Sequence, residues 1–200
     1  EDEDIHTRTA AEVFQVFPSF IDKELRQQAK AINFGIVYGQ SAFGLSNQLG
    51  ISRKMAQTYI NNYFARYSGV RQFIDNTIEI ARQTQKTTTL LGRIRLLPDI
   101  TSTNATTRKF AERTAINTPI QGTAADLIKL AMIKAADALH TKNLKSVMLL
   151  SVHDEIVFEV PPDELEAVKA LAKEVMEGIW DLKVPLKVNV VAGDNWAQAH

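Results

Sequence analysis

The segment Leu25–Gly44, LRQQAKAINFGIVYGQSAFG, contains two cations followed by two aromatic residues at intervals of four positions. These residues are Arg26, Lys30, Phe34 and Tyr38. A spacing of four places side chains along one face of an α-helix, so this face would carry positive charge at one end and flat rings at the other. A ligand with phosphates at one end and a sugar or base at the other would match it. An amphipathic helix with solvated cations and buried rings would have the same spacing.

Gly35 lies inside the same predicted helix. Glycine in a helix interior costs about 1 kcal/mol relative to alanine, so its presence needs a reason. We expect that another group approaches the helix closely at this position.

The composition is that of an ordinary globular protein. Of the 200 residues, 45% are hydrophobic and 23% are charged, which allows one core with room for two lobes. Cysteine is absent, which excludes disulfides and thiolate metal sites and agrees with a reducing compartment. No apolar run approaches the ~20 residues that span a bilayer, and the N-terminal EDEDIHTRTA lacks a signal-peptide pattern. We therefore expect no membrane partner.

Charge is distributed unevenly along the chain, although the net charge is zero. Residues 82–113 contain seven Lys or Arg against two acids, and residues 154–181 contain nine acids against two Lys. The zero net charge argues against general nucleic-acid binding. A basic middle segment could nevertheless face a polyanion, and an acidic segment could face solvent or a metal ion. Two solvated helix faces would explain the same distribution.

The order of the predicted elements indicates an α+β fold with a mostly antiparallel sheet. Helices dominate the first two-thirds, interrupted by a short hairpin at TTTLLGRIRLLP (residues 87–98) that turns at Gly92. The pattern then changes to strand, strand, helix, strand. The predicted helices cover residues 9–16, 22–38, 42–49, 52–67, a segment after Gly69 up to about residue 85, 104–114, 120–139 and 163–180, and the late strands cover residues 146–152, 156–160 and 185–191.

In SVHDEIVFEV (residues 151–160), Asp154 and Glu155 interrupt two β-rich runs and would lie at the tip of a tight hairpin. A solvated turn is the simpler interpretation, because Asp is common in turns. The apolar residues on both sides instead predict a well-buried hairpin, where adjacent carboxylates would need a cation or a donor. Oxygen ligands of this kind suit Mg²⁺ bound together with substrate phosphates.

In RKFAERTAINTPIQGTAAD (residues 108–126), Arg113, Asn117 and Gln121 are also four positions apart, with Pro119 between them. Pro119 predicts a bend or a new helix start. Guanidinium and amide side chains on a face rich in Ala and Thr could contact sugars and base edges in a minor groove. A polar contact between helices is the alternative.

Three motifs, in their order and spacing, point to one family. RQQAKAINFGIVYG, AERTAINTPIQGTAAD and SVHDEIVFEV resemble family A DNA polymerases, the family of bacterial DNA polymerase I. The resemblance covers essentially the whole chain. It implies template-directed DNA synthesis, with residues 1–98 as a fingers subdomain and residues 99–200 as part of a palm subdomain. The family's thumb and exonuclease regions are expected to be missing.

The resemblance also implies how the incoming deoxynucleoside triphosphate is held. The helix with the cations and rings would close over this nucleotide. By the family's pattern, Arg26 and Lys30 hold the triphosphate, Lys30 is the candidate to protonate the leaving pyrophosphate, and His6 is a second phosphate contact. Phe34 would pack on the sugar, and Tyr38 would lie at the nascent base pair.

Further implied roles concern DNA and metal ions. The primer–template DNA would contact Arg113, Asn117 and Gln121, with His153 near the primer terminus. Asp154 would be a Mg²⁺ ligand in a two-metal site, and Glu155 is a further catalytic candidate. The family's other metal-binding aspartate lies in a strand motif resembling DYSQIELR, which this sequence lacks. We therefore expect an upstream polymerase fragment as a partner. The resemblance also implies a location in the bacterial cytoplasm, at the nucleoid.

Two residue choices also depart from the family's pattern. Ile94 and Leu96 stand in the hairpin where the family often has Arg and Tyr, so the family's DNA contact at this hairpin does not carry over directly. Phe34 stands where some members carry Tyr, which implies discrimination against dideoxy analogues.

Other functions are compatible with parts of the pattern. The missing aspartate would allow a non-catalytic module that binds triphosphate and DNA through salt-sensitive phosphate contacts. Single-subunit RNA polymerases share the fold and a similar helix, although the match with His153, Asp154 and Glu155 favours DNA synthesis. A purely structural protein is the third alternative.

Overall fold

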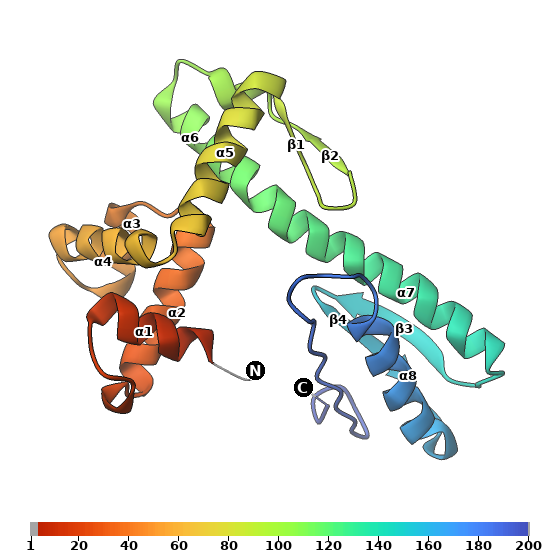
Figure 1. The fold of residues 1–200 in the computed structure, drawn as a ribbon. Coiled ribbons are helices and arrows are strands. Elements are labelled where there is room, and N and C mark those ends of the chain that lie inside the picture. Colours follow the sequence, from red (N-terminus) through yellow and green to blue (C-terminus); the bar gives the residue numbers. More distant parts are fainter. Residues whose placement is uncertain (1–3, 200) are drawn as a thin grey trace. The chain divides into compact units, whose positions relative to one another are not determined.

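The computed structural model describes residues 4–199, which form helices and two small antiparallel sheets (Figure 1). The predicted α+β fold class is therefore confirmed. The chain divides into two compact units, Glu1–Ile120 and Gln121–His200. Residues 99–120 pack with the first unit, so the boundary between the two compact units falls after residue 120. The division into fingers and palm subdomains after residue 98 is a division by function, and it stays a prediction. Within the described residues, no helix combines the length and apolarity needed to cross a membrane.

Four helices of the first unit share one hydrophobic core. The buried core residues come from all four helices, so each helix is amphipathic and turns one face inward. The helices are α1 (Ile5–Phe14), α2 (Lys23–Val37), α3 (Ala42–Leu49) and α4 (Arg53–Arg66). The core residues are Val13, Ile32, Ile36, Ala42, Leu45, Ala56 and Tyr63.

Side-chain caps define where these helices begin. Asp22 accepts a hydrogen bond from the Leu25 backbone N–H at 2.8 Å, and Ser52 caps α4 in the same way. Such caps satisfy N–H groups that have no partner within the helix. Asp4 starts α1 earlier than the hydrophobic pattern predicts, because its carboxylate accepts from the backbone of His6.

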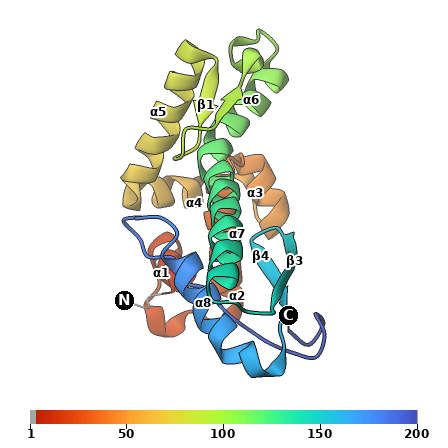
Figure 2. The same cartoon turned by 90° about the vertical axis from the view of Figure 1, so that its right-hand side faces the viewer.

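The rest of the first unit packs around a second core. The predicted hairpin is confirmed, and Gly92 lies in its turn with a φ of 84°. The elements of this part are α5 (Ser68–Thr84), β1 (Lys86–Thr88), β2 (Ile94–Leu96) and α6 (Ala105–Asn117). The β1–β2 ribbon, which is this hairpin, lies beside α5 and α6 (Figure 2). The core residues are Ala81, Leu97, Ile100, Ala111 and Ala115.

The break expected at Pro119 takes the form of a π-helical turn, Thr118–Gly122. Proline lacks the N–H that would bond the Ala115 carbonyl in a regular α-helix. The buried Thr87 donates a hydrogen bond from Oγ1 to that carbonyl oxygen at 3.3 Å. Strand β1 is therefore tied to the helix at the point where proline removes a backbone donor.

The second unit combines two helices with one hairpin. One face of the hairpin, through Met148 and Phe158, packs against buried residues of both helices, which are Ala135, Leu139, Val168 and Leu171. The elements are α7 (Thr123–Thr141), β3 (Val147–Val152), β4 (Glu155–Glu159) and α8 (Leu165–Glu177).

Glu164 is a buried carboxylate that organises the chain entering this hairpin. It accepts hydrogen bonds from the backbone N–H groups of Lys145 and Ser146 at 2.8 and 2.9 Å, and from the Ser146 hydroxyl at 2.6 Å. These donors lower the pKa of Glu164, because they stabilise the ionised form. The carboxylate is thus satisfied within the fold and acts structurally.

The predicted strand at residues 185–191 is wrong. The structure assigns no strand there, and each of the two sheets within residues 4–199 has only two strands. Alternating apolar residues favour an extended backbone, but a strand also needs a neighbour to bond with. Here the Val188 backbone N–H instead donates to Glu177 Oε1 at 3.0 Å.

The prediction of a well-buried hairpin at residues 151–160 is also wrong. Val147, Leu149 and Leu150 on β3 are 49%, 54% and 40% exposed. A two-stranded sheet has two faces, and helices α7 and α8 cover only one of them. The sequence shows that these residues are apolar, but it does not show how many layers cover them.

Replacing Thr87 should test how β1 is tied to α6. We expect Thr87→Val to lower the free energy of unfolding by about 1–3 kcal/mol, because the Ala115 carbonyl loses its side-chain donor. Thr88→Val is the matched control on the exposed face of the same strand, with an expected change within about 0.5 kcal/mol. Urea unfolding would measure both, and equal changes in the two variants would contradict this assignment.

Candidate functional site

Helix α2 presents the four residues singled out in the sequence on its exposed side. Arg26, Lys30, Phe34 and Tyr38 are all exposed. The helix is orientated by its opposite face, where five residues are buried: Ala29, Ile32, Asn33, Gly35 and Ile36. The charge-then-ring face therefore exists in the structure.

The two rings on this face form an exposed stack. Phe34 and Tyr38 lie with their ring centroids 6.0 Å apart at an interplanar angle of 13°, and they are 44% and 40% exposed. This exposure contradicts the alternative of an amphipathic helix that buries its rings. Flat apolar surfaces left open to solvent can pack against a sugar or a base.

Arg26 already has an anionic partner, which is Asp4 at the start of α1. The Arg26 Nε atom donates to Asp4 Oδ2 at 2.6 Å, and Nη2 donates to Oδ1 at 3.3 Å. The Arg26 guanidinium, together with the Thr7 hydroxyl, holds the pKa of Asp4 well below its usual range. Both side chains are solvent-exposed, so the pair can separate at low cost when another anion competes for Arg26.

His6 lies beside the same face, half-buried on α1. Its ring centroid is 5.8 Å from that of Phe34. Burial lowers the pKa of His6, and the charges of Arg26 and Lys30 lower it further, while Asp4 acts in the opposite direction. The structure therefore brings all five predicted nucleotide-binding residues together on α1 and α2.

The C-terminal end of α2 is a tight junction. Gly39 has a φ of 69°, the left-handed conformation that commonly ends a helix at glycine. A Cβ atom on Gly39 would lie 3.0 Å from Arg113 Cγ. The close approach predicted at Gly35 comes from Gln40 of the same chain, whose side-chain oxygen occupies the space that a Cβ would take.

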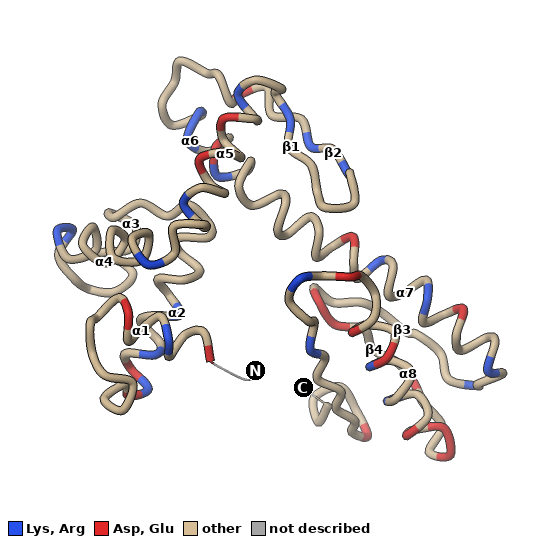
Figure 3. Tube along the Cα trace, viewed as in Figure 1, with Lys and Arg blue, Asp and Glu red and all other residues tan. Residues whose placement is uncertain are grey.

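Two of the four predicted DNA-binding residues, Arg113 and Asn117, lie on α6. Arg113 is exposed and packs its guanidinium 5.9 Å from the Phe110 ring centroid. The amide oxygen of Asn117 is buried without a hydrogen-bond partner among the described residues. Gln121 is exposed and is the first residue of the second unit. Lys and Arg positions mark both strands of the β1–β2 ribbon and α6 (Figure 3).

The hairpin turn of the second unit carries the predicted metal ligand. Val152 pairs with Glu155, so His153 and Asp154 form a two-residue turn, and both are exposed. His153 has a φ of 54°, a left-handed conformation that His adopts more readily than most residues. Over residues 4–199, no group of three or more His, Cys, Asp or Glu side chains could hold a metal ion.

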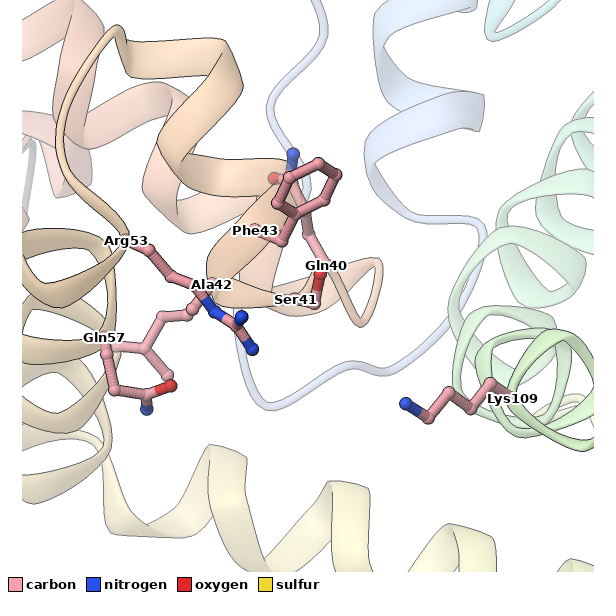
Figure 4. Close-up of a pocket in the computed structure, with 8 residues that line it drawn as sticks. Gln40, Ser41, Ala42, Phe43, Arg53, Gln57 and Lys109 are labelled. Atoms are coloured by element: carbon pink, nitrogen blue, oxygen red, sulfur yellow. The ribbon is translucent and has the colours of Figure 1, made fainter. Parts of the chain in front are cut away.

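An open depression in the first unit was not anticipated from the sequence. It has a volume of about 540 Å³, and Arg53 and Lys109 extend toward it from different elements, with Gln40, Ser41 and Phe43 between them (Figure 4). These residues come from α3, α4, α6 and the junction after α2. No periodic signal in the sequence could have identified it, because packing alone brings these elements together.

The chain is an α+β protein with a charged and aromatic helix face in its first unit and an exposed carboxylate at a hairpin turn in its second unit. Comparison with known proteins identifies its family. The sequence profile described as DNA polymerase family A matches residues 1–198. The chain belongs to DNA polymerase family A.

Individual relatives support this assignment. The chain is 50% identical to DNA polymerase I of Bacillus subtilis over 198 residues, covering 99% of this chain and 22% of that protein. It is 51% identical to DNA polymerase I of Caldicellulosiruptor bescii over 193 residues, covering 96% of this chain and 23% of that protein. The chain thus spans less than a quarter of the length of these relatives.

A solved structure is similar over nearly the whole chain. It is described as the POL domain of Pol1 from M. smegmatis in complex with DNA primer-template and dNTP. The TM-score is 0.94 at 43% sequence identity, covering 98% of this chain and 35% of that chain. The family match favours the DNA polymerases over the single-subunit RNA polymerases as relatives of this chain.

The ion pair between Asp4 and Arg26 gives a pH-dependent prediction. Because the folded-state pKa of Asp4 is depressed from 3.8, the pair contributes its full stability above about pH 4 and loses it as the pH falls through the lower folded-state value. An NMR titration of the Asp4 carboxyl carbon should show a midpoint well below 3.8. In Arg26→Gln the midpoint should return toward 3.8, and a midpoint unchanged by this substitution would contradict the pairing.

Gly39 should be the less replaceable of two left-handed glycines. Gly39→Ala should cost about 1–2 kcal/mol for the positive φ and an additional amount for the contact with Arg113. Gly50→Ala is the matched control, because Gly50 has a φ of 66° and no atom within 4 Å of an added Cβ. In an Arg113→Ala background the additional cost should disappear. Urea unfolding of the four variants checks this, and equal losses at both glycines would refute the contact.

Proposed function

We propose that this chain supplies the nucleotide-binding helix and part of the catalytic centre for template-directed DNA synthesis, the addition of deoxynucleotides to a primer 3′ end. The observation that best supports it is the exposed face of α2, where two cations precede a ring stack. In a family A chain, this face suits a deoxynucleoside triphosphate. The assignments of individual residues below are proposals that rest on this geometry and on the family's pattern.

Arg26, Lys30 and His6 would bind the triphosphate. Their charges and N–H donors would offset the negative charge of the β and γ phosphates, which increases on the leaving group during phosphoryl transfer. Arg26 would exchange the exposed carboxylate of Asp4 for a phosphate, which preserves a bidentate ion pair. Lys30 would donate a proton to the leaving pyrophosphate.

Phe34 and Tyr38 would contact the nucleoside. Their stacked, exposed rings form a continuous apolar surface at the end of α2 opposite the cations. Phe34 would pack against the deoxyribose, and Tyr38 would lie at the new base pair. Tyr38 ends the helix and directly precedes the left-handed Gly39, so rotation at this junction would move the ring relative to the helix.

Asp154, at the exposed hairpin turn, would hold Mg²⁺. One carboxylate is sufficient for a share in such a site, because Mg²⁺ in phosphoryl-transfer sites takes one or two carboxylates together with substrate phosphates and water. When bound, the metal ions supply Lewis-acid stabilisation of the attacking and leaving oxygens. Glu155, half-buried at the start of β4, is the second acidic group at this position and is proposed to support Asp154.

Primer–template DNA would contact Arg113, Asn117, Gln121 and His153. The amide oxygen of Asn117 is buried without a partner among the described residues, so turning the amide outward would let it accept from the guanine amino group in the minor groove. Lys and Arg on α6 and the β1–β2 ribbon would add phosphate contacts that weaken with salt.

Full activity would require an upstream part of the family's polymerase domain. Within the described residues no three acidic or histidine side chains gather into a metal site, so the second metal-binding aspartate would come from an upstream polymerase fragment. In this proposal residues 1–98 act as the fingers and residues 99–200 as part of the palm. The activity belongs at the DNA of a bacterial cell, since the named relatives are bacterial DNA polymerases.

Primer extension on a recessed DNA duplex tests the proposal. The chain is assayed with Mg²⁺ and four deoxynucleoside triphosphates, alone and with a separately produced upstream fragment that carries the missing strand. We expect extension only in the mixture, and Asp154→Ala should abolish it. Asp163→Ala, an exposed acid outside the site, is the control that should leave extension unchanged.

Triphosphate binding by the chain alone separates catalysis from binding. Lys30→Ala should weaken binding by about 10- to 100-fold, because a charge-assisted hydrogen bond contributes about 1.5–3 kcal/mol and each 1.4 kcal/mol is a factor of ten. Lys54→Ala on α4 is the control with the same loss of charge. Binding without extension in the mixture would support the non-catalytic module instead. Extension by the chain alone would show that another acid replaces the missing ligand.

A further inference from the structure

A buried polar contact links His6 to the interior of the first unit. Asn33, which is 9% exposed on α2, places its amide Nδ2 atom 3.0 Å from His6 Nδ1 on α1. Thr9, fully buried one turn further along α1, holds the same amide. Its Oγ1 atom lies 3.2 Å from Asn33 Oδ1 and 3.1 Å from Nδ2. The contact therefore runs from Thr9 through Asn33 to the imidazole ring.

This contact decides which ring nitrogen carries the proton. An amide NH₂ group can only donate a hydrogen bond, so Nδ1 of His6 must accept and carries no proton. In the neutral ring the proton is then on Nε2. Burial is the main cause that lowers the pKa of His6. Of the charged groups that act on the ring, Asp4 at the start of α1 raises the pKa, and Arg26 and Lys30 on α2 lower it. A ring that is neutral near pH 7 has only one N–H donor.

We propose that Asn33, held by Thr9, is a positioning residue that keeps His6 in the Nε2–H tautomer, so that the ring offers a hydrogen-bond donor to an oxygen of the triphosphate. This inference rests on the proposed role of His6 in phosphate binding. The opposite tautomer would present a lone pair at Nε2, which repels a phosphate oxygen. Asn33 thus acts on the nucleotide through His6, without contacting the nucleotide itself.

Packing alone does not require an amide at this position. The neighbouring core of α1 and α2 is formed by apolar residues, including Val13, Ile32 and Ile36. Burying an amide among them is unfavourable unless its hydrogen bonds are made. The contacts with Thr9 and His6 satisfy the amide, and in this arrangement its Nδ2 atom is the one that faces the ring.

The tautomer can be measured directly in the chain with the natural sequence. Ring ¹⁵N chemical shifts from two-bond ¹⁵N–¹H correlation spectra distinguish Nε2–H from Nδ1–H, and His6→Gln identifies the His6 signals. We expect His6 to be in the Nε2–H form above pH 7.5. An Nδ1–H ring, or a rapidly exchanging mixture of the two forms, would overturn the proposal. This measurement needs no nucleotide, so its outcome is independent of the proposed polymerase function.

Two nearly isosteric variants test the chain of contacts. Asn33→Asp replaces the donor by an acceptor, so His6 should change to the Nδ1–H form, and its pKa should rise beside the new carboxylate. Thr9→Val removes the hydroxyl that holds the amide and should reduce the Nε2–H fraction. Thr9→Val also keeps the test valid if Asn33→Asp does not fold. A His6 tautomer unchanged in the folded variants would refute the positioning role.

Triphosphate affinity as a function of pH provides the functional readout. In Asn33→Asp only protonated His6 can donate from Nε2, so affinity should fall about tenfold between pH 7 and pH 9 relative to the natural sequence. A loss of affinity that is the same at every pH would indicate a merely structural effect and would contradict the proposal. If Lys30→Ala also fails to change affinity, the proposed binding face is wrong, whatever the tautomer of His6.

Discussion

Helix α2 can expose two cations and two rings in a row because its opposite face is buried in a four-helix core. Ile32 and Ile36 pack with residues of α1, α3 and α4, and this packing determines the rotation of α2 about its axis. A small rotation would bury Phe34 or expose Ile36, and either change would be unfavourable because it transfers apolar surface between core and water. The position of His6 beside this face follows from the same core, because α1 packs on α2 within it.

Polar contacts refine what the core establishes. The carboxylate of Asp4 starts α1 and also holds the guanidinium of Arg26, so one side chain both caps a helix and orders a proposed ligand-binding group. Asn33 connects the buried side of α2 to His6 on its exposed side. At the end of the helix, Gly39 allows α6 to approach closely through Arg113. Each of these contacts joins segments more than 20 residues apart or a helix to its own cap.

Much of the local structure followed from the sequence because it depends on neighbouring residues. Gly50 marked the end of α3, and Ser52 marked the start of α4. Gly92 marked a hairpin turn, and Pro119 marked the break before α7. The family was also recognisable, since its motifs are contiguous. The failures were of another kind. The extended segment at residues 185–191 and the exposed side of β3 both depend on whether a distant strand or layer is present, which alternation of apolar residues does not encode.

By itself, the sequence determined the helix periods, the caps, the spacing of Arg26, Lys30, Phe34 and Tyr38, and membership of DNA polymerase family A. Only the tertiary structure decided that the rings stack in the open, that Asp4 pairs with Arg26, and that Asn33 directs a donor at His6. The physical reason is that spacing along one helix follows from the local backbone. Contacts between helices instead depend on how their cores pack, and on which polar groups that packing leaves within hydrogen-bond distance.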